Sequence, residues 1–409
     1  MMQMMQSIAK LKSLSKTQHR LLTLILVWCG IAVVSSVYIT LPMTSLFAQA
    51  FQTTPELTAW TSSAFSLTYA LGFLLLAPLS DRYGTKAMML FGLVALTLVS
   101  PLIGLMDSLP GVITIRAVQG LVAASFVPNA LTYIMETFPL EKRVATIGFI
   151  STGFLLAGIV GQVFSSLVVQ SLSWSYVFYW LGIAYLLSAV LLGLFAPSGA
   201  HPRIRSTSAS TSTNSFFLVY KQMGVLFRNK PLMFCYLIAL TLFLTFVGMY
   251  AAIGSYLSYS PYELNSQQIL SVRATGIVGM TLSLFTGKLV ARFGMQRMVK
   301  VGLLVAITGL AAIGIQGNLT LLILSSIVYV AGISMIIPTL VSLAGTIAGN
   351  SRVAAMTIYS FILFLGATLG PLITLNLLKT TSFVITFESL ALLLTISYCF
   401  SYFTKNPEQ

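Results

Sequence analysis

Apolar runs recur along the whole chain and are separated by short polar connectors. An α-helix needs about 20 consecutive apolar residues to cross the hydrocarbon core of a bilayer. The pattern predicts twelve membrane-spanning helices, at approximately 21–48, 59–80, 88–106, 111–135, 145–168, 175–196, 232–256, 269–290, 299–316, 320–344, 354–378 and 383–403. The longest polar interruption, 197–230, divides these spans into two sets of six.

The composition agrees with a membrane protein. Hydrophobic residues make up 57% of the chain and charged residues 7%, whereas an average soluble domain carries about 25% charged residues. This excludes a soluble globular protein and a disordered one. The length of the apolar runs favours a helical protein over an outer-membrane barrel, so the predicted fold class is an all-α membrane protein.

The positive charges indicate the topology. The formal net charge is +14, and all Lys and Arg residues except Lys379, Arg116 and Arg273 fall on one side of the predicted spans. Lys and Arg collect on the cytoplasmic side of membrane proteins. We therefore predict a multi-pass protein of a bacterial inner (plasma) membrane with both termini in the cytoplasm. The basic excess reflects this topology, and no nucleic-acid partner is expected.

These patterns give the expected domains. They are a cytoplasmic N-terminal segment (1–20), a six-helix bundle (21–196), a cytoplasmic linker (197–230), a second six-helix bundle (231–403) and a cytoplasmic tail (404–409).

An internal repeat relates the two halves. A shift of 210 residues aligns Leu79 with Leu289, Arg82 with Arg292, Gly84 with Gly294, Pro128 with Pro338 and Ala157 with Ala367. A constant shift over separate regions indicates a duplication. Both halves begin inside, so the repeat is parallel, as in transporters that bind substrate between two halves.

The connector after the second span carries the most specific motif, Ala-Pro-Leu-Ser-Asp-Arg-Tyr-Gly-Thr-Lys at 77–86. Gly84 suits a tight turn, and Asp81 can face a helix N-terminus, where negative charge is stabilised. Arg82 and Lys86 remain at the cytoplasmic surface and can pair with an acid. This stretch resembles the signature of the major facilitator superfamily, and the chain as a whole looks like its twelve-span drug/proton antiporter and sugar-efflux-like group.

The resemblance implies two pseudo-symmetric bundles that work by alternating access, and a cytoplasmic gate or latch at the motif. The latch residues it implies are Asp81, Arg82, Gly84, Lys86, the acid Glu136 at the inner end of the fourth span, and Arg292 and Gly294 in the second copy. The chain departs from the family pattern at Ala77, where a glycine is usual, at Thr85, where a basic residue is usual, and at Ala291, which replaces the acid in the second copy. The alternative is a solvated turn.

The fourth span begins with Arg116, Gln119 and Gly120, which resemble the family's R-x-x-Q-G motif. The resemblance implies a role in proton relay or conformational coupling. An arginine inside a span normally faces a cavity or pairs with backbone carbonyls. The alternative is a side chain that extends to the outer headgroups.

Small residues follow one face of the fifth span. Gly153, Ala157 and Gly161 are spaced by four residues, Gly158 lies beside them, and Gly366 and Gly370 repeat the spacing in the eleventh span. Such faces let helices approach closely. The position resembles the family's antiporter motif in a weakened form, with close packing alone as the alternative.

The predicted cavity lacks a deep acid. The first, fourth, seventh and tenth spans contain no carboxylate in their interior, and only Glu388 falls inside a span. Neutral or anionic amphipathic compounds therefore fit better than polycations. Polar or amphipathic side chains that can line a mixed apolar pocket are Tyr38, Tyr69, Asn129, Tyr133, Gln162, Tyr250, Arg273, Tyr329 and Asn376. Arg273 is a candidate contact for an anionic group or a gate, and extension to the headgroups is equally compatible with its position.

The leading hypothesis is a secondary active transporter that exports small amphipathic compounds by proton antiport. The alternatives are a proton-linked or facilitative transporter of a sugar or organic anion, and a membrane channel. We expect no enzyme, because no intramembrane catalytic constellation is present, and no metal or cofactor, because neither a ligand cluster nor a P-loop occurs. Expected partners are membrane lipids, a small-molecule substrate and protons, and the protein is expected to be a monomer.

The predicted topology can be tested with reporter fusions. Green fluorescent protein at the C-terminus should fluoresce, and alkaline phosphatase inserted after Ser108, in the connector before the fourth span, should be active, because only the latter site is predicted to be outside. The reverse pattern would contradict the assigned orientation.

Overall fold

The computed structural model describes residues 16–197, 221, 223–258, 262–315 and 318–404. Within these ranges the regular secondary structure is helical, without a β-strand. Twelve helical segments of the described chain are long and apolar enough to cross a membrane. The predicted fold class and the predicted number of spans are therefore confirmed.

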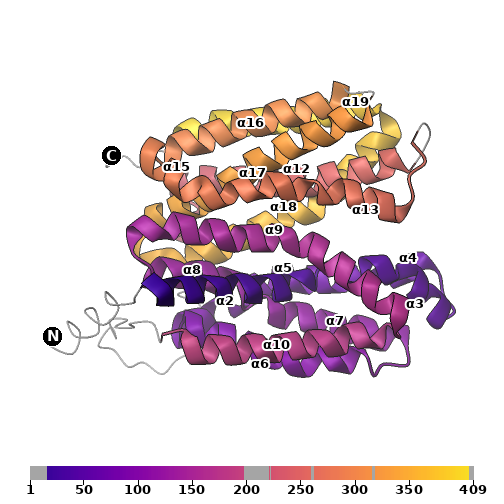
Figure 1. Cartoon of the computed structure of the whole chain (residues 1–409). Helices are drawn as coiled ribbons and strands as arrows, with labels where there is room; N and C mark the ends of the chain where they lie inside the picture. Colours follow the sequence, from indigo (N-terminus) through magenta and orange to yellow (C-terminus); the bar gives the residue numbers. More distant parts are fainter. Residues whose placement is uncertain (1–15, 198–220, 222, 259–261, 316–317, 405–409) are drawn as a thin grey trace. The chain divides into compact units, whose positions relative to one another are not determined.

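Figure 1 follows the helices in chain order. The first half contains α2 (Lys16–Ser35), η1 (Leu41–Met43), α3 (Thr44–Ala50), α4 (Pro55–Thr58), α5 (Trp60–Tyr83), α6 (Thr85–Ile103), α7 (Leu109–Ala123), α8 (Val127–Thr137), α9 (Leu140–Ser171) and α10 (Ser175–Phe195). The second half contains α12 (Lys230–Leu257), α13 (Ser266–Ala274), α14 (Gly276–Met280), η2 (Thr281–Phe285), α15 (Thr286–Phe293), α16 (Met295–Ile315), α17 (Leu319–Ile347), η3 (Gly349–Ser351), α18 (Arg352–Thr380), α19 (Phe383–Phe400) and η4 (Ser401–Phe403).

The first span is shorter than its apolar run. We predicted a span over 21–48, but α2 ends at Ser35, and turns at 36–40 lead into η1 and α3. Pro42 lies in η1; it has no N–H to donate to residue 38, and its ring would clash with that carbonyl group in a continuous helix. Hydropathy did not register this break because the residues on both sides of it are apolar.

The described residues fall into two compact units. The first takes its residues from 1–143, 153–224 and 351–357, and the second from 144–152, 225–350 and 358–409. Helices α9 and α18 thus contribute residues to both units. The residue ranges predicted from the sequence for the two six-helix bundles, 21–196 and 231–403, remain predictions.

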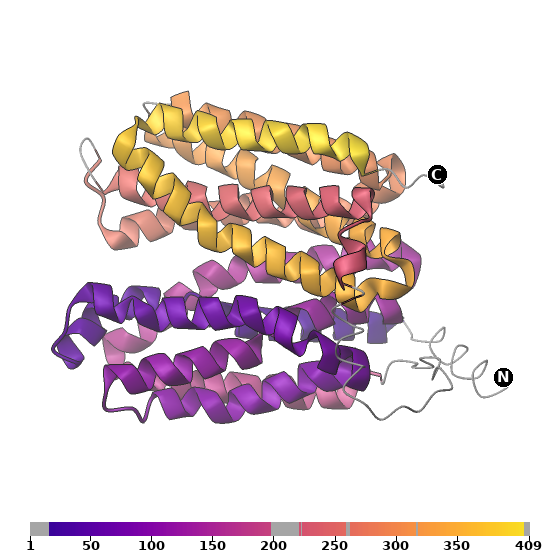
Figure 2. The ribbon, with the colours of Figure 1, turned by 180° about the vertical axis from the view of Figure 1, so that it is seen from behind.

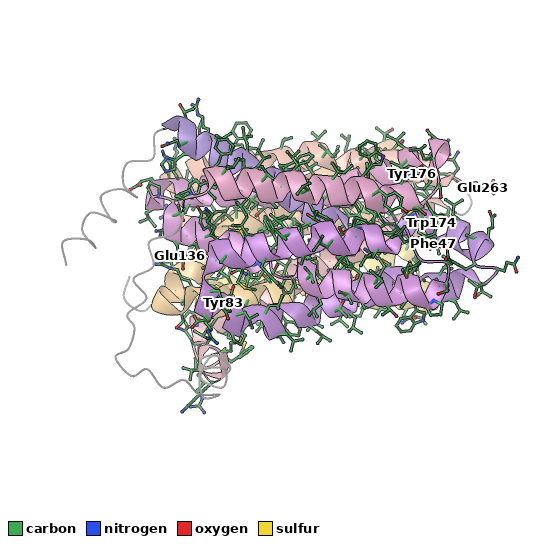
Figure 3. The ribbon with its side chains drawn as sticks, turned by 90° about the horizontal axis from the view of Figure 1, so that it is seen from below. Phe47, Tyr83, Glu136, Trp174, Tyr176 and Glu263 are labelled. Carbon is green, nitrogen blue, oxygen red and sulfur yellow. The ribbon has the colours of Figure 1, made fainter. Side chains whose placement is uncertain are left out.

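Aromatic packing covers one end of the first unit. Phe47 of α3 meets the ring of Trp174 at a centroid distance of 5.2 Å, and Trp174 in turn meets Phe178 of α10 at 6.2 Å. Figure 3 shows Phe47 and Trp174 at one end of this unit and Tyr83 and Glu136 at the other. The short helix α3 therefore joins this end of the unit through aromatic rings, and Phe47 is fully buried.

The internal repeat reappears in the helix contacts. A Cβ atom added to Gly92 of α6 would lie 3.3 Å from the Val122 carbonyl oxygen, and one added to Gly302 of α16 would lie 3.1 Å from that of Gly332. Both members of this contact are related by the shift of 210 residues. The same close approach of two helices thus occurs at the same register in each half.

The register changes by one residue at the fifth and eleventh spans. Gly161 of α9 lies against the carbonyl of Ser35, and Gly370 of α18 lies against that of Leu244 in α12. These two contacts are related by a shift of 209 residues, so the contact register pairs Ala157 with Gly366 rather than with Ala367. Figure 2 shows α18 alongside α12 in the second unit.

The two turn glycines adopt the same backbone conformation. Gly84 has φ 89° and ψ 159°, and Gly294 has φ 82° and ψ 155°. Their N–H groups donate to the carbonyls of Ser80 at 3.0 Å and Val290 at 2.8 Å and so end α5 and α15. Residues with a side chain rarely adopt this region, which explains why glycine stands at both repeat positions.

We expect Gly84→Ala and Gly294→Ala each to destabilise the protein by about 1–3 kcal/mol, because alanine would be strained in this conformation. The melting temperature in detergent, followed by reaction of the buried thiols of Cys29 and Cys235 with a fluorogenic maleimide, measures the effect. Gly193→Ala is the control, because a Cβ at that helical position has no neighbour closer than 3.8 Å. Equal melting temperatures for all three variants would contradict the explanation.

Candidate functional site

Arg116 lies at the centre of a buried polar network in the first unit. Its side chain is 0% exposed. Nε donates to the Thr61 carbonyl of α5 at 2.9 Å, Nη1 to Oε1 of Gln119 at 2.6 Å, and Nη2 to the Ser36 carbonyl at 2.9 Å. These contacts exclude the alternative in which Arg116 extends to the outer headgroups. They join α7 to α5 and to the segment that follows α2.

Neighbouring groups fix the members of this network. Gln119 donates from Nε2 to the Ser100 hydroxyl of α6 at 2.7 Å, and the Arg116 guanidinium lies 4.2 Å from the ring centroid of Phe65. The hydroxyl groups of Ser36 and Tyr185 are hydrogen-bonded to each other. A buried cation surrounded by an aromatic face and three acceptors is well stabilised where water is excluded.

The network uses a carbonyl that the end of α2 makes available. The last four carbonyl groups of an α-helix have no partner within the helix, and α2 ends at Ser35. The guanidinium of Arg116 donates to the next carbonyl, that of Ser36. The arginine thus satisfies a backbone group that the break would otherwise leave in a low-dielectric interior.

The small face of α9 packs against the same end of α2. A Cβ on Gly153 would lie 3.2 Å from Val27, and one on Gly161 would lie 2.8 Å from the Ser35 carbonyl oxygen. The Ser35 hydroxyl donates to the carbonyl of Ala157 at 3.2 Å. The R-x-x-Q-G motif of α7 and the small residues of α9 therefore meet at one dipeptide, Ser35-Ser36.

The residues predicted to form a latch have specific partners at the end of the first unit that carries Tyr83 and Glu136. The Thr85 hydroxyl donates to Oε2 of Glu136 at 3.1 Å, so Glu136 meets the residue that replaces a basic side chain of the family pattern. Lys86 donates from Nζ to the Gly193 carbonyl at 3.3 Å and to that of Ala196. It therefore caps the C-terminus of α10, where a cation is favoured by the helix dipole.

The two arginines of the repeated motif lie in equivalent surroundings. The guanidinium of Arg82 is 5.4 Å from the ring centroid of Tyr83, and that of Arg292 is 5.3 Å from the ring centroid of Phe293. The repeated turn thus keeps its glycine, its arginine and an adjacent aromatic ring. Its acid is kept only in the first copy, as Asp81.

Three cavity candidates of the first unit are engaged in packing within it. The Asn129 side chain is hydrogen-bonded to the Ser80 hydroxyl and donates to the Ser125 carbonyl at 2.7 Å. Tyr133 donates to the Pro197 carbonyl at 2.9 Å. Tyr69 is buried, with its ring 5.5 Å from that of Phe65 and 4.7 Å from that of Phe73.

Tyr38 and Gln162 lie beside Gly158. Gln162 donates from Nε2 to the Gly158 carbonyl at 2.7 Å, and a Cβ on Gly158 would be 3.6 Å from the Tyr38 ring. Both side chains are half-buried. Of the five first-unit cavity candidates, these two are the half-buried pair, and together with Gly158 they form a partly accessible group next to the end of α2.

The second-unit candidates come from four helices. Tyr329 of α17 is buried and donates to the Thr245 hydroxyl of α12 at 2.9 Å. Tyr250 of α12 and Arg273 of α13 meet where Nη2 of Arg273 donates to the Tyr250 carbonyl at 3.0 Å. Asn376 of α18 is exposed. Three of these four candidates therefore gather along α12.

Comparison with known proteins identifies the family. The model of the Major Facilitator Superfamily matches residues 24–408. The chain belongs to the major facilitator superfamily.

Individual members of the superfamily are similar over most of the chain or over part of it. An uncharacterized transporter of Buchnera aphidicola subsp. Schizaphis graminum is 25% identical over 364 residues, which cover 89% of this chain and 86% of that protein. Multidrug resistance protein 3 of Bacillus subtilis is 33% identical over 121 residues, 30% of this chain and 24% of that protein. The crystal structure of the human organic anion transporter MFSD10 (TETRAN) superposes with a TM-score of 0.76 at 16% identity, covering 95% of this chain and 100% of that one.

Sequence reasoning missed several members of the Arg116 network in this superfamily member. Ser36 and Thr61, whose carbonyls accept from Arg116, were not among the candidates, nor were Ser100, which accepts from Gln119, and Tyr185, which is hydrogen-bonded to the Ser36 hydroxyl. The available signal was the adjacent pair Ser35-Ser36 inside an otherwise apolar run, six residues before Pro42. Backbone carbonyls, which supply two of the three Arg116 acceptors, carry no sequence signal.

We expect Arg116→Ala to destabilise the protein by about 3 kcal/mol, because it leaves three buried acceptors without their donor. Arg116→Lys should recover only part of this loss, since one ammonium group cannot reproduce the planar fork of a guanidinium. Melting temperatures in detergent provide the measurement, with Arg297→Ala, at an exposed arginine of α16, as the control. An unchanged melting temperature for Arg116→Ala would show that the network contributes nothing to stability.

Proposed function

We propose that this protein exports small amphipathic compounds across a bacterial inner membrane by proton antiport with alternating access. It acts as a monomer, with both termini in the cytoplasm and membrane lipids around the two bundles. Membership of the superfamily and a relative named multidrug resistance protein 3 support export.

The main support for the proposal is one observation: the R-x-x-Q-G motif of α7 and the small residues of α9 both contact the dipeptide Ser35-Ser36. Arg116 holds the Ser36 carbonyl, and the small residues of α9 contact Ser35. The end of α2 is thereby fixed from two neighbouring helices. A tilt or rewinding of α2 has to break or replace these contacts together, which makes this dipeptide a suitable coupling point for a conformational cycle.

The charge of the site supports neutral or anionic substrates. The three acceptors of Arg116 are two backbone carbonyls and one neutral side-chain amide. Its positive charge is therefore spread over dipoles and not cancelled by a carboxylate among these acceptors. Like charges repel strongly in a low-dielectric interior, so a polycationic compound is disfavoured near this network.

A second candidate function is proton-linked or facilitative transport of a sugar or an organic anion. The likeness in fold to a human organic anion transporter and the presence of Arg273 in α13 support this version. In this version the Arg116 network has the same role in coupling, but the substrate class and the direction of transport differ, and protons drive transport only in the proton-linked form.

The test uses inside-out vesicles that contain the protein. A proton gradient is imposed, a panel of amphipathic compounds is added, and the pH difference is followed with a fluorescent dye. We expect some compounds to collapse the gradient with the wild-type protein and Arg116→Ala to lose at least nine-tenths of this activity, because the coupling contact to Ser36 is absent.

Two controls separate coupling from loss of folded protein. Arg297→Ala should behave as the wild type, and each variant should be compared at equal amounts of protein that elutes as a single species in detergent. If no compound collapses the gradient but saturable counterflow is seen, the facilitative version replaces antiport. Full activity of Arg116→Ala would overturn the coupling role of the network.

A further inference from the structure

Two polar groups at the α12–α13 contact of the second unit lack a hydrogen-bond partner. Nη2 of Arg273 donates to the Tyr250 carbonyl at 3.0 Å. Nε of Arg273 and the hydroxyl group of Tyr250 are both buried atoms, and neither has a partner among the described residues. Buried polar groups are nearly always hydrogen-bonded. Two unpartnered polar groups on adjacent side chains therefore indicate a place where a further group can bind.

Two glycines create the space in which these groups lie. A Cβ atom on Gly254 of α12 would clash with Nη2 of Arg273, and one on Gly276 of α14 would clash with the Tyr250 hydroxyl. The guanidinium and the phenol are thus each held against a helix backbone that has no side chain at that position. Both groups are positioned by the fold before any ligand is present.

Arg273 differs from Arg116 in the hydrogen bonds of its guanidinium group. Nε and both Nη atoms of Arg116 donate to protein acceptors. Arg273 is half-buried, and among the described residues its Nη2 has the Tyr250 carbonyl as acceptor while its Nε has none. Likewise the hydroxyl of Tyr329 has Thr245 as its partner, whereas that of Tyr250 has no partner in the part of the chain that the structure describes.

The available groups define the chemistry of the missing partner. A guanidinium can only donate hydrogen bonds, and a phenol can donate one more. A carboxylate accepts two parallel bonds from the edge of a guanidinium and keeps further lone pairs for a hydroxyl donor. One side of the Tyr250 ring is apolar. There the ring of Phe246 lies in an edge-to-face arrangement, with 5.2 Å between the two ring centroids.

We propose that Arg273 and Tyr250 form a binding subsite for the carboxylate of an amphipathic substrate whose apolar body packs against the aromatic side chains of α12. Arg273 supplies the positive charge and the forked donors, and Tyr250 supplies one neutral donor. The subsite rests on the proposed function in that its occupant is the transported compound. It narrows the substrate class from amphipathic compounds to amphipathic monocarboxylates.

The test measures binding without a gradient, so it is independent of proton coupling. The full-length protein in detergent is titrated with benzoate, 4-phenylbutyrate, indole-3-acetate and decanoate, each paired with its primary amide, and the melting temperature is recorded. We expect at least one carboxylate to bind at least tenfold more tightly than its amide. Arg273→Gln should remove this preference, and Tyr250→Phe should reduce it about threefold to tenfold, as expected for one hydrogen bond.

Further variants keep the result interpretable. Arg273→Lys keeps the charge but lacks the fork, so it should retain only part of the preference. Lys379→Gln, at an exposed cation of α18, should keep all of it. If Arg273→Gln does not fold, Gly276→Ala serves instead, because its added methyl group displaces the Tyr250 hydroxyl.

The outcomes separate the subsite from the proposed function. Equal affinity for carboxylates and amides throughout the panel, or a preference that persists in Arg273→Gln, would overturn the subsite. A carboxylate preference that depends on Arg273 would support it even if the vesicle experiment showed no proton antiport. Proton antiport without any Arg273-dependent preference would leave the proposed function in place and remove the subsite alone.

Discussion

The bilayer interior offers no water to a backbone carbonyl that has lost its helical partner, and this constraint governs the region around the end of α2. The helix stops at Ser35, ahead of Pro42, and the carbonyl of Ser36 then accepts from Arg116. Any unsatisfied backbone group at membrane depth costs several kcal/mol. The arginine and the broken helix therefore depend on each other, since each satisfies a polar group that the other would leave unpaired.

The close approach of helices depends on glycine residues at the points where the helices touch. Gly161 lets α9 reach the Ser35 carbonyl, and Gly370 lets α18 reach that of Leu244. Without a hydrophobic force between helices in lipid, close backbone packing is a main source of association. The two halves use the same type of contact at corresponding places, but α2 ends at its contact, beside Arg116, whereas α12 continues through the contact at Leu244.

Hydropathy and charge were sufficient to predict the class of fold, because both follow from the bilayer itself. Twelve apolar runs of sufficient length predicted twelve spans, and the turn glycines at Gly84 and Gly294 were recognisable because both repeats require a positive φ. The site was predicted in part. Arg116 and Gln119 were identified by the resemblance to a family motif and the small face of α9 by its spacing, whereas the cavity candidates Asn129 and Tyr133 hold hydrogen bonds within the first unit.

The number of spans, the repeat and the positions of the chemistry-bearing side chains could be predicted from the amino-acid sequence, because they depend on composition and local backbone requirements. The acceptors that those side chains meet depend on how the helices pack and could not be predicted in this way. The tertiary structure placed Arg116 on the carbonyls of Ser36 and Thr61, and it left Nε of Arg273 without a partner among the described residues. Every residue carries the same backbone carbonyl group. Whether a given carbonyl is free to accept a hydrogen bond from a side chain depends on where helices end and where they pack together, and not on the identity of the amino acid.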